Sequence, residues 1–463
     1  MPFTRRGRRM VALLRGLYSI LGLFFGKKWQ KPRPDFEENP RESSFLGAIY
    51  LGYKYYYRPP VKAEPGIEDY FRQQNLDFTP PAGFIAQKQI TISAGGDLMP
   101  YERINPGSAE HLWDDVGDFF FGADVVVANL ETPIVSHLPV VAVPEVMLND
   151  MRFNGSEAMF QVFSGNEKFK NGRYRGYDVL STANNHSLDQ GPEGIFETLN
   201  FLEKHKVLAT GTARSAQERE RIPMIERQGI NVAFIAWTYS LNKFLPPTHQ
   251  PWLVNYARLN RPGEPLDQLV ADVYRARKQG ADIVILLLHT GNAYQAFPSA
   301  HTVDTYHRIF EQSGVDVILG SHPHNPQPME RYAFADPATG RIKQGFAIYS
   351  LADFVAYDIF VWDRLVPLLR LTVQKGRLHN QPYTQLTNVQ VLPVYNWGQR
   401  DAKNCQAGEI RFLDLKKTVR LVGQGKRPPF LSDLCVAELT HLNWFCDHCF
   451  LPENTRHLLA STD

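Results

Sequence analysis

Short runs of apolar residues alternate with amphipathic segments through the middle of this chain. The apolar runs cover residues 90–94, 124–130, 178–182, 230–237, 282–288 and 315–319. Between several of them, apolar residues recur at helical spacing, over residues 194–206, 267–278 and 303–312. Continuous apolar runs of this length are typical of strands buried on both faces. Strand and helix in alternation predict a layered α/β fold.

Changes in this pattern predict three regions. The Pro-rich segment Thr79-Pro80-Pro81 separates an N-terminal extension, residues 1–85, from a main domain, residues 86–375. Beyond about Gln374 the alternation of strand and helix fades, which leaves a C-terminal extension over residues 376–463.

Composition excludes several protein classes. The chain has 463 residues, of which 43% are apolar and 21% charged, and its net charge is +2. These values are ordinary for a folded soluble body, and they exclude a disordered chain, a collagen-like repeat and a polytopic membrane protein.

The N-terminus departs strongly from this average. Residues 1–34 contain nine Lys or Arg residues and no acid, which leaves 41 basic and 48 acidic residues in the rest of the chain. The acidic body makes nucleic acid a poor partner. The apolar stretch 10–26 is interrupted by Arg15 and is shorter than the roughly 20 residues of a spanning helix.

Four interpretations of residues 1–34 stay open: a marginal membrane span, a secretory signal, an amphipathic helix on an anionic membrane surface, and a solvated basic tail. We expect membrane association through residues 1–34 and a location in the cell envelope, with a cytoplasmic location as the alternative. The aromatic stretch 45–57 is expected to pack on the main body.

Polar residues gather where the predicted strands end. They are Asp97, Asn129, Glu131, Asn184, Asn185, His186, His289, His322 and His324. A single histidine of this kind is more often a hydrogen-bonded structural residue. The carboxyl ends of strands in α/β folds meet in one place, so the group as a whole predicts a shared metal site.

Carboxylate, amide and imidazole ligands without thiolate suit Mn, Zn or Fe. A bridging carboxylate can hold two such ions about 3.5–4 Å apart, in sites that activate water and bind phosphoryl oxygens. The cofactor we expect is therefore a divalent metal, as one ion or two.

Several motifs resemble one family. They are GGDLM at 95–99, NLETPIV at 129–135, ANNHSLDQG at 183–191, HTGNAY at 289–294, GSHPHNPQ at 320–327 and YSLADFV at 349–355. From about Ile90 to about Val373 the chain resembles the CapA family of capsule and poly-γ-glutamate synthesis proteins, in the calcineurin-like metallophosphoesterase superfamily. The resemblance implies a β-sandwich flanked by helices, here with N- and C-terminal extensions.

The resemblance also implies ligand roles. Asp97 and His324 would hold a first metal, Glu131 would bridge, and Asn185, His289 and His322 would hold a second.

His186 would donate a proton to the leaving group, with Asp189 orienting its ring. The alternative for His186 is a structural residue at a helix start.

Three motifs depart from the family pattern. Met99 stands where classical phosphoesterases carry a histidine ligand. Ala293 removes a carboxylate from the usual HWGxEY, in which Thr290 also replaces an aromatic residue. Ala352 and Asp353 replace Gly and Asn of the usual YSLGNF. These departures put catalysis in doubt more than metal binding.

The resemblance predicts a metal-dependent hydrolase in the synthesis, release or export of an envelope polymer such as poly-γ-glutamate. A poly-γ-glutamate ligase or export complex is the expected partner. The alternatives are a non-catalytic scaffold subunit of a membrane polymer synthase, and a soluble phosphoesterase acting on a small metabolite.

The C-terminal extension holds all four cysteines, Cys405, Cys435, Cys446 and Cys449, near two histidines. Their spacing permits a structural zinc site, a disulfide or plain buried thiols, and the sequence leaves these alternatives open.

Overall fold

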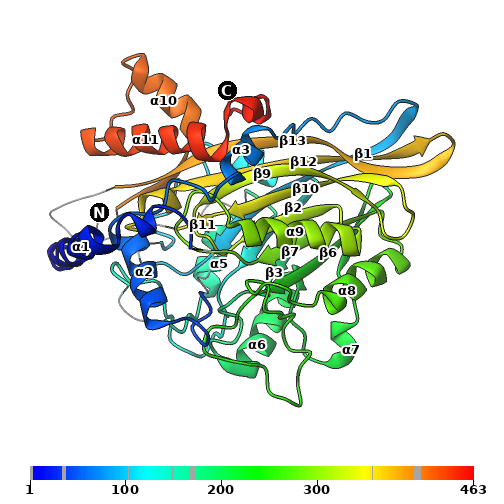
Figure 1. Cartoon of the computed structure of the whole chain (residues 1–463), viewed down its shortest axis with the longest axis horizontal. Helices are drawn as coiled ribbons and strands as arrows, with labels where there is room; N and C mark the ends of the chain where they lie inside the picture. Colours follow the sequence, from blue (N-terminus) through cyan, green and yellow to red (C-terminus); the bar gives the residue numbers. More distant parts are fainter. Residues whose placement is uncertain are drawn as a thin grey trace.

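The computed structural model describes residues 4–33, 38–102, 104–147, 151–166, 173–356, 358–399 and 408–462. Two mixed β-sheets lie face to face, with helices on the outside (Figure 1). The predicted α/β sandwich flanked by helices is therefore confirmed.

The first sheet has eight strands in the described residues, with β1 near its centre. In order across the sheet they are β14 (Ile410–Asp414), β13 (Gln381–Gly398), β12 (Leu365–Leu378), β1 (Phe84–Leu98), β2 (Val125–Leu130), β3 (Val179–Ser181) and β4 (Leu208–Thr210), with β11 (Asp353–Val355) also paired to β1. Strands β1 to β4 run parallel, and β12 to β14 run antiparallel.

The second sheet has six strands in the described residues. Their order is β5 (Met224–Arg227), β6 (Ile230–Thr238), β7 (Ile283–His289), β8 (Val317–Ser321), β10 (Ile342–Leu351) and β9 (Pro326–Ala335). Because β6, β7, β8 and β10 are parallel, their carboxyl ends lie at one edge.

The core lies between the sheets and follows the two-residue repeat of a strand. In β2, Val125 and Val127 face the second sheet, whereas Val126 and Ala128 belong to a separate apolar cluster on the outer face. Because both faces of β2 are covered, the strand is apolar throughout, which made it visible in the sequence.

Helices cover the outside of both sheets. They are α4 (Gly117–Phe121), α5 (Glu157–Phe163), α6 (Gly191–Lys204), α7 (Ala216–Arg219), α8 (Asp267–Lys278) and α9 (Ala300–Ser313). The three predicted helical segments correspond to α6, α8 and α9.

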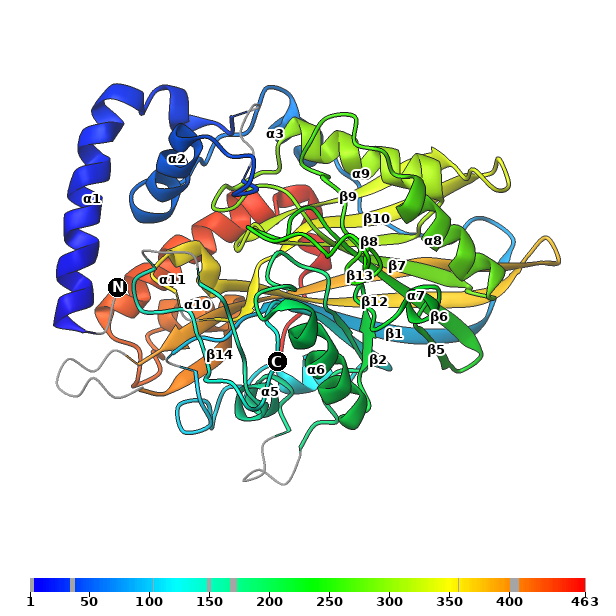
Figure 2. The ribbon, with the colours of Figure 1, turned by 90° about the horizontal axis from the view of Figure 1, so that it is seen from below.

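The N-terminal extension folds onto one side of this body (Figure 2). It contains α1 (Arg5–Phe25), a 3-10 turn (Lys28–Gln30), α2 (Phe45–Tyr56) and α3 (Ile67–Arg72). The Tyr55 hydroxyl donates to Asp358 at 2.8 Å, and the Tyr56 hydroxyl donates to the Met147 carbonyl. The expected packing of this aromatic stretch is confirmed. Among the described residues, none of the helices combines the length and the apolar character needed to cross a bilayer.

The C-terminal region continues the first sheet beyond residue 375. The boundary predicted at 375 falls within β12, and β13 then pairs with β12 over nearly its whole length. The later elements are α10 (Leu415–Gly423), α11 (Asp433–Phe445), a π-helical turn (Cys446–Phe450) and a 3-10 turn (Glu453–Leu458); another 3-10 turn (Val361–Arg364) precedes β12.

Cys435, Cys446 and Cys449 are buried free thiols. None of them belongs to a potential metal-binding group of the described residues. Plain buried thiols are thus the alternative that holds for these three, and Cys405 lies outside the described residues.

Candidate metal centre

The two sheets bring their carboxyl ends to one place. Asp97 ends β1, Asn129 and Glu131 end β2, and His289 ends β7. The loops after β3 and β8 add Asn185, His186, His322 and His324. Contacts across the two sheets join these loops: the backbone N–H of His322 donates to Oδ2 of Asp97 at 3.0 Å.

A close approach of two backbones places Asp97. The N–H of Asp97 donates to the carbonyl of Ala352 at 2.9 Å. A Cβ on Gly96 would lie 1.9 Å from that same oxygen, so this approach requires glycine. The motif GGD therefore reflects packing as well as chemistry.

The turn that carries His322 and His324 is conformationally costly. Their φ angles are 95° and 63°, in the left-handed region that non-glycine residues rarely adopt. Each such residue costs about 1–3 kcal/mol and persists where the surroundings hold it. The turn directs both imidazoles toward one cluster, with ring centroids 5.6 Å apart.

Two overlapping groups of buried side chains have ligand atoms close enough to hold a metal ion. One consists of Asp97, His324 and Asp353, and the other of Asp97, Glu131 and His289. Asp97 is common to both groups, whereas Glu131 belongs to one. The bridging role that the resemblance gives to Glu131 stays a prediction.

Unpartnered polar atoms support a cation at this place. Within the described residues, both carboxylate oxygens of Glu131 and Nδ1 of His322 are buried without a hydrogen-bond partner. Buried polar atoms of this kind are rare in folded proteins and call for a ligand. Oxygen and imidazole donors without thiolate fit Mn, Zn or Fe, as the sequence predicted.

The raised pKa values of the buried carboxyl groups also support a cation at this place. Burial, together with Asp353, raises the pKa of Asp97 to about 6, although His324 acts in the opposite direction. Burial and the Asp97 carboxylate raise the pKa of Glu131 well above its usual range. Acids gathered in a dry cluster favour neutral forms, and a divalent cation would stabilise the ionised ones.

The pKa values of His289 and His324 are shifted in opposite directions. Burial and the neighbouring imidazoles lower the pKa of His289 well below its usual range. Burial would also lower the pKa of His324, but Asp353, together with Asp97 and Asp358, outweighs burial and raises it to about 9. Asp353 Oδ1 lies 2.7 Å from Nδ1 of His324, which leaves Nε2 of His324 to face a ligand.

Three amides frame the cluster. Asn129 donates to Asp97 at 2.8 Å, and Asn184 donates to the Leu130 carbonyl at 2.8 Å. Oδ1 of Asn185 lies 3.0 Å from Nε2 of His289. The structure thus places Asn185 beside His289 and gives Asn184 a supporting position; the ligand role of Asn185 stays a prediction.

His186 and Asp189 form a pair at the rim. Nδ1 of His186 lies 2.7 Å from Oδ2 of Asp189, and that oxygen also accepts from the backbone N–H of Phe153 at 2.7 Å. Nε2 of His186 lies 4.0 Å from Glu131, on the cluster side. The predicted orienting contact is present, and the free edge of the ring faces the cluster.

Sequence reasoning missed two residues near the cluster. Asp353 was noted only as a departure from the family pattern, although it begins β11 directly beside Asp97. Its position at the end of β10 matches the strand-end signal that identified the other residues. Glu38, in the N-terminal extension, lies 3.1 Å from Nε2 of His322 and carried no such signal. Met99 packs in the outer apolar cluster.

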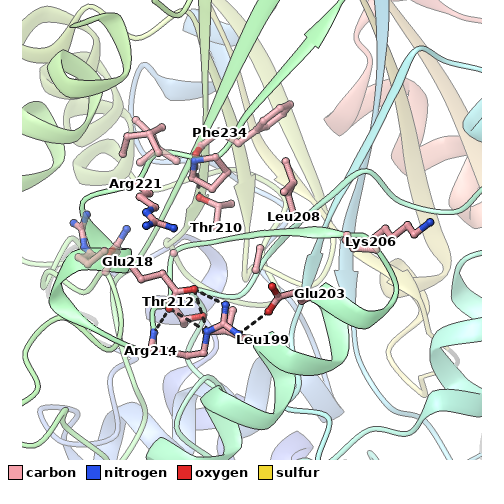
Figure 3. Close-up of a pocket in the computed structure, with 18 residues that line it drawn as sticks. Leu199, Glu203, Lys206, Leu208, Thr210, Thr212, Arg214, Glu218, Arg221 and Phe234 are labelled. Atoms are coloured by element: carbon pink, nitrogen blue, oxygen red, sulfur yellow. Dashed lines mark hydrogen bonds and ion pairs between the residues drawn. The ribbon is translucent and has the colours of Figure 1, made fainter. Parts of the chain in front are cut away.

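A cavity of about 500 Å³ lies elsewhere, among α6, α7, β4 and β6 (Figure 3). Its charged side chains are engaged with one another: Arg214 pairs with Glu203 at 2.8 Å and with Glu218 at 2.7 Å. The cavity contains none of the predicted ligands and does not replace the cluster as the candidate site.

Comparison with known proteins identifies the family. Residues 91–358 match the family model described as bacterial capsule synthesis protein PGA_cap. The capsule biosynthesis protein CapA of Bacillus anthracis is 23% identical over 288 residues, covering 61% of this chain and 63% of that protein. The PGA biosynthesis protein CapA of Bacillus subtilis (strain 168) is 24% identical over 284 residues, covering 60% and 66%.

A solved structure, the sulfate thiohydrolase SoxB of Thermus thermophilus, is similar with 12% identity and a TM-score of 0.30, covering 68% of this chain and 57% of that one.

The chain aligns with less than two thirds of the length of either CapA protein. The family model, in contrast, matches more than half of this chain, and the matched residues 91–358 include all six motifs. The chain therefore belongs to the PGA_cap family of bacterial capsule synthesis proteins.

Proposed function

We propose that this protein is a metal-dependent hydrolase that cleaves a phosphoester or amide bond in the synthesis, release or export of an envelope polymer such as poly-γ-glutamate. One observation carries the proposal: buried carboxylates and imidazoles from both sheets converge on Asp97, and neither Glu131 oxygen has a hydrogen-bond partner among the described residues. The names of the two CapA relatives, which refer to capsule and PGA biosynthesis, support the polymer as substrate class.

The residues present suit hydrolysis. Asp97, Glu131, His289, His324 and Asp353 would hold the metal, with Nδ1 of His322 as a further ligand. When bound, the metal would supply Lewis-acid activation of water and substrate. The attacking water oxygen forms the new bond to phosphorus or carbonyl carbon and releases one proton to bulk water, as the bond to the leaving oxygen or nitrogen breaks. His186 donates its Nε2 proton to that leaving atom. Asp189 holds the ring in the required tautomer from the Nδ1 side.

The test combines metal content with turnover. The full chain, supplied with Mn²⁺ or Zn²⁺, is assayed against phosphoesters and γ-glutamyl peptides, beside Asp97→Asn and a surface control, Tyr274→Phe on α8. We expect bound metal and hydrolysis in the wild type and the control, and loss of both in Asp97→Asn. Metal binding without turnover on either substrate class would contradict the hydrolase and favour the scaffold subunit.

We also propose that α1 binds an anionic membrane surface. One side of α1, including Tyr18 and Phe25, packs against α2. A neighbouring, exposed side carries apolar residues in a helical stripe: Leu13, Leu17, Ile20 and Phe24. The helix lies along the edge of the molecule in Figure 2. The apolar stripe and the exposed basic residues at both ends suit a lipid surface with negative headgroups.

Co-sedimentation with vesicles tests this surface. We expect the full chain to bind vesicles of phosphatidylcholine with phosphatidylglycerol, and to bind pure phosphatidylcholine much more weakly. The double variant Leu17→Glu/Phe24→Glu should lose binding, whereas Tyr274→Glu, which alters an exposed aromatic residue on α8, should not. Equal binding by the double variant would contradict the proposal.

A further inference from the structure

Glu38 reaches the metal centre from the N-terminal extension. It precedes the family-matched region, residues 91–358, by more than fifty positions in sequence. Its side chain is 3% exposed, and it forms an ion pair of 2.8 Å with Lys54 of α2, which is 0% exposed. A fully buried ion pair is costly unless further hydrogen bonds satisfy both charged groups, so the remaining contacts of Glu38 and Lys54 indicate the role of the pair.

The partners of Glu38 are donors. Oε2 accepts from the backbone N–H of Ala293 at 2.7 Å, and Oε1 accepts from Lys54. Lys54 also donates to the carbonyl of Ala293 at 2.5 Å. A carboxylate held by an ammonium group and an amide N–H is an acceptor toward its remaining neighbour.

That neighbour is Nε2 of His322, at 3.1 Å from Oε2. If Nε2 carried a lone pair, it would face a carboxylate oxygen with no proton between them. Nε2–H donating to Glu38 is therefore the favoured tautomer, and the Tyr239 hydroxyl, 3.0 Å from the same nitrogen, can share this hydrogen. Nδ1 of His322 then carries the lone pair.

The lone pair at Nδ1 is the one a metal would use. This atom is buried and has no hydrogen-bond partner among the described residues. The ring lies between those of His289 and His324, with centroids 5.1 and 5.6 Å away. A carboxylate on the far nitrogen of a ligating histidine fixes its tautomer and orientation, and its loss typically weakens metal binding 10–100-fold.

We infer that Glu38, held by Lys54, is a positioning residue that presents Nδ1 of His322 to the metal, so that the N-terminal extension completes the site. This inference rests on the proposed metal centre. It also accounts for the missing family carboxylate at position 293. The small Ala293 leaves its backbone N–H accessible, and the Glu38 carboxylate from the distant extension accepts a hydrogen bond from it.

The arrangement couples the extension to the site. The same segment is anchored away from His322 by the ion pair of Glu42 with Arg261 and by the hydrogen bond of Tyr55 to Asp358. These two contacts supply matched controls, because they hold the extension without touching His322.

The experiment measures Mn²⁺ affinity of the full chain by calorimetric titration. We expect Glu38→Gln, which keeps the shape but removes the charge, to bind Mn²⁺ 10–100-fold more weakly than the wild type. Glu42→Gln and Tyr55→Phe should stay within twofold. Melting without metal shows whether each variant is folded, and a Glu38→Asp variant should recover part of the affinity if the carboxylate is what matters.

The outcomes separate this inference from the proposed function. A wild type that binds Mn²⁺ together with a Glu38→Gln variant that binds equally tightly would overturn the inference alone. Loss of affinity in Tyr55→Phe as large as that in Glu38→Gln would also overturn it, because docking of the extension in general would then be responsible. A wild type that binds neither Mn²⁺ nor Zn²⁺ would overturn the metal centre itself.

Discussion

At the scale of single residues, His186 is the side chain whose role is most open to test. Its Nδ1 is committed to Asp189, and its other edge faces Glu131. His186→Asn removes the proton donor without removing a ligand of either metal group. We expect turnover to fall about 10²–10⁴-fold with unchanged Mn²⁺ affinity.

The leaving group gives this prediction a sharper readout. Substrates whose leaving group is already a weak base need little help from an acid, so they should lose much less activity in His186→Asn than substrates with an alkoxide leaving group. Equal losses with both kinds of substrate would contradict the role of general acid.

The buried thiols supply a prediction independent of the site. Burial raises the pKa of both Cys446 and Cys449 to about 12, so both stay neutral well above physiological pH. Their neutral form contributes stability below the ordinary thiol pKa, and this contribution is lost as the pH rises toward 12. In a Cys405→Ser variant at pH 8, we expect a thiol reagent to modify Cys446 and Cys449 of the folded protein about a thousandfold more slowly than a free thiol.

Denaturant provides the control for this measurement, since unfolding should release the remaining three cysteines to rapid modification. Fast modification of the folded protein, or zinc that copurifies in proportion to these thiols, would contradict it.

At the scale of elements, Gly96 sets the distance between β1 and the segment before β11. Its Cβ would collide with the backbone oxygen of Ala352. We expect Gly96→Ala to destabilise the fold by about 1–3 kcal/mol and to weaken Mn²⁺ binding, because Asp97 moves with its strand. Gly423→Ala, at the end of α10 with open space around it, should change stability by less than about 0.5 kcal/mol. Denaturant titration and calorimetry measure both, and an unaltered Gly96→Ala would contradict this account of the GGD motif.

The elements also show what the sequence could and could not predict. Strands β2, β7 and β8 are buried on both faces, so their apolar runs stood out, and the polar residues after them marked the site. The β12–β13 hairpin was missed beyond residue 374 because its outer part alternates with polar residues that are half exposed. An alternating pattern of this kind is a weaker signal than a continuous apolar run.

The N-terminal extension was beyond sequence reasoning for a different reason. Glu38 lies in a charged segment without periodicity, and its contact with His322 spans 284 positions along the chain. No local sequence pattern encodes a partner at that distance, so the contact between Glu38 and His322 could be identified only from the folded structure. Asp353, by contrast, obeys the strand-end rule, and comparison with the family motif drew attention away from it.

At the scale of the whole molecule, the candidate metal centre joins the two sheets. Asp97 and Glu131 come from the first sheet, and His289 and His324 follow strands of the second. An ion held by this set would stabilise the sandwich by about 2.7 kcal/mol at a concentration a hundred times its Kd. We expect Mn²⁺ to raise the melting temperature of the wild type by several degrees and a chelator to reverse the rise.

The relative stability of the wild type and an Asp97→Asn variant should depend on whether Mn²⁺ is present. Because burial raises the pKa of Asp97 to about 6, stability is lost as the pH rises from the ordinary Asp pKa through that value when no cation is present. At pH 8 without metal, we therefore expect Asp97→Asn to be more stable than the wild type by about 1–2 kcal/mol, since it carries no buried charge. With Mn²⁺ present, the wild type should become the more stable of the two, because the variant lacks the carboxylate shared by both metal groups. Melting curves of both proteins with and without Mn²⁺ test this crossing, and a variant that is less stable under both conditions would show that Asp97 is retained for structure rather than for metal.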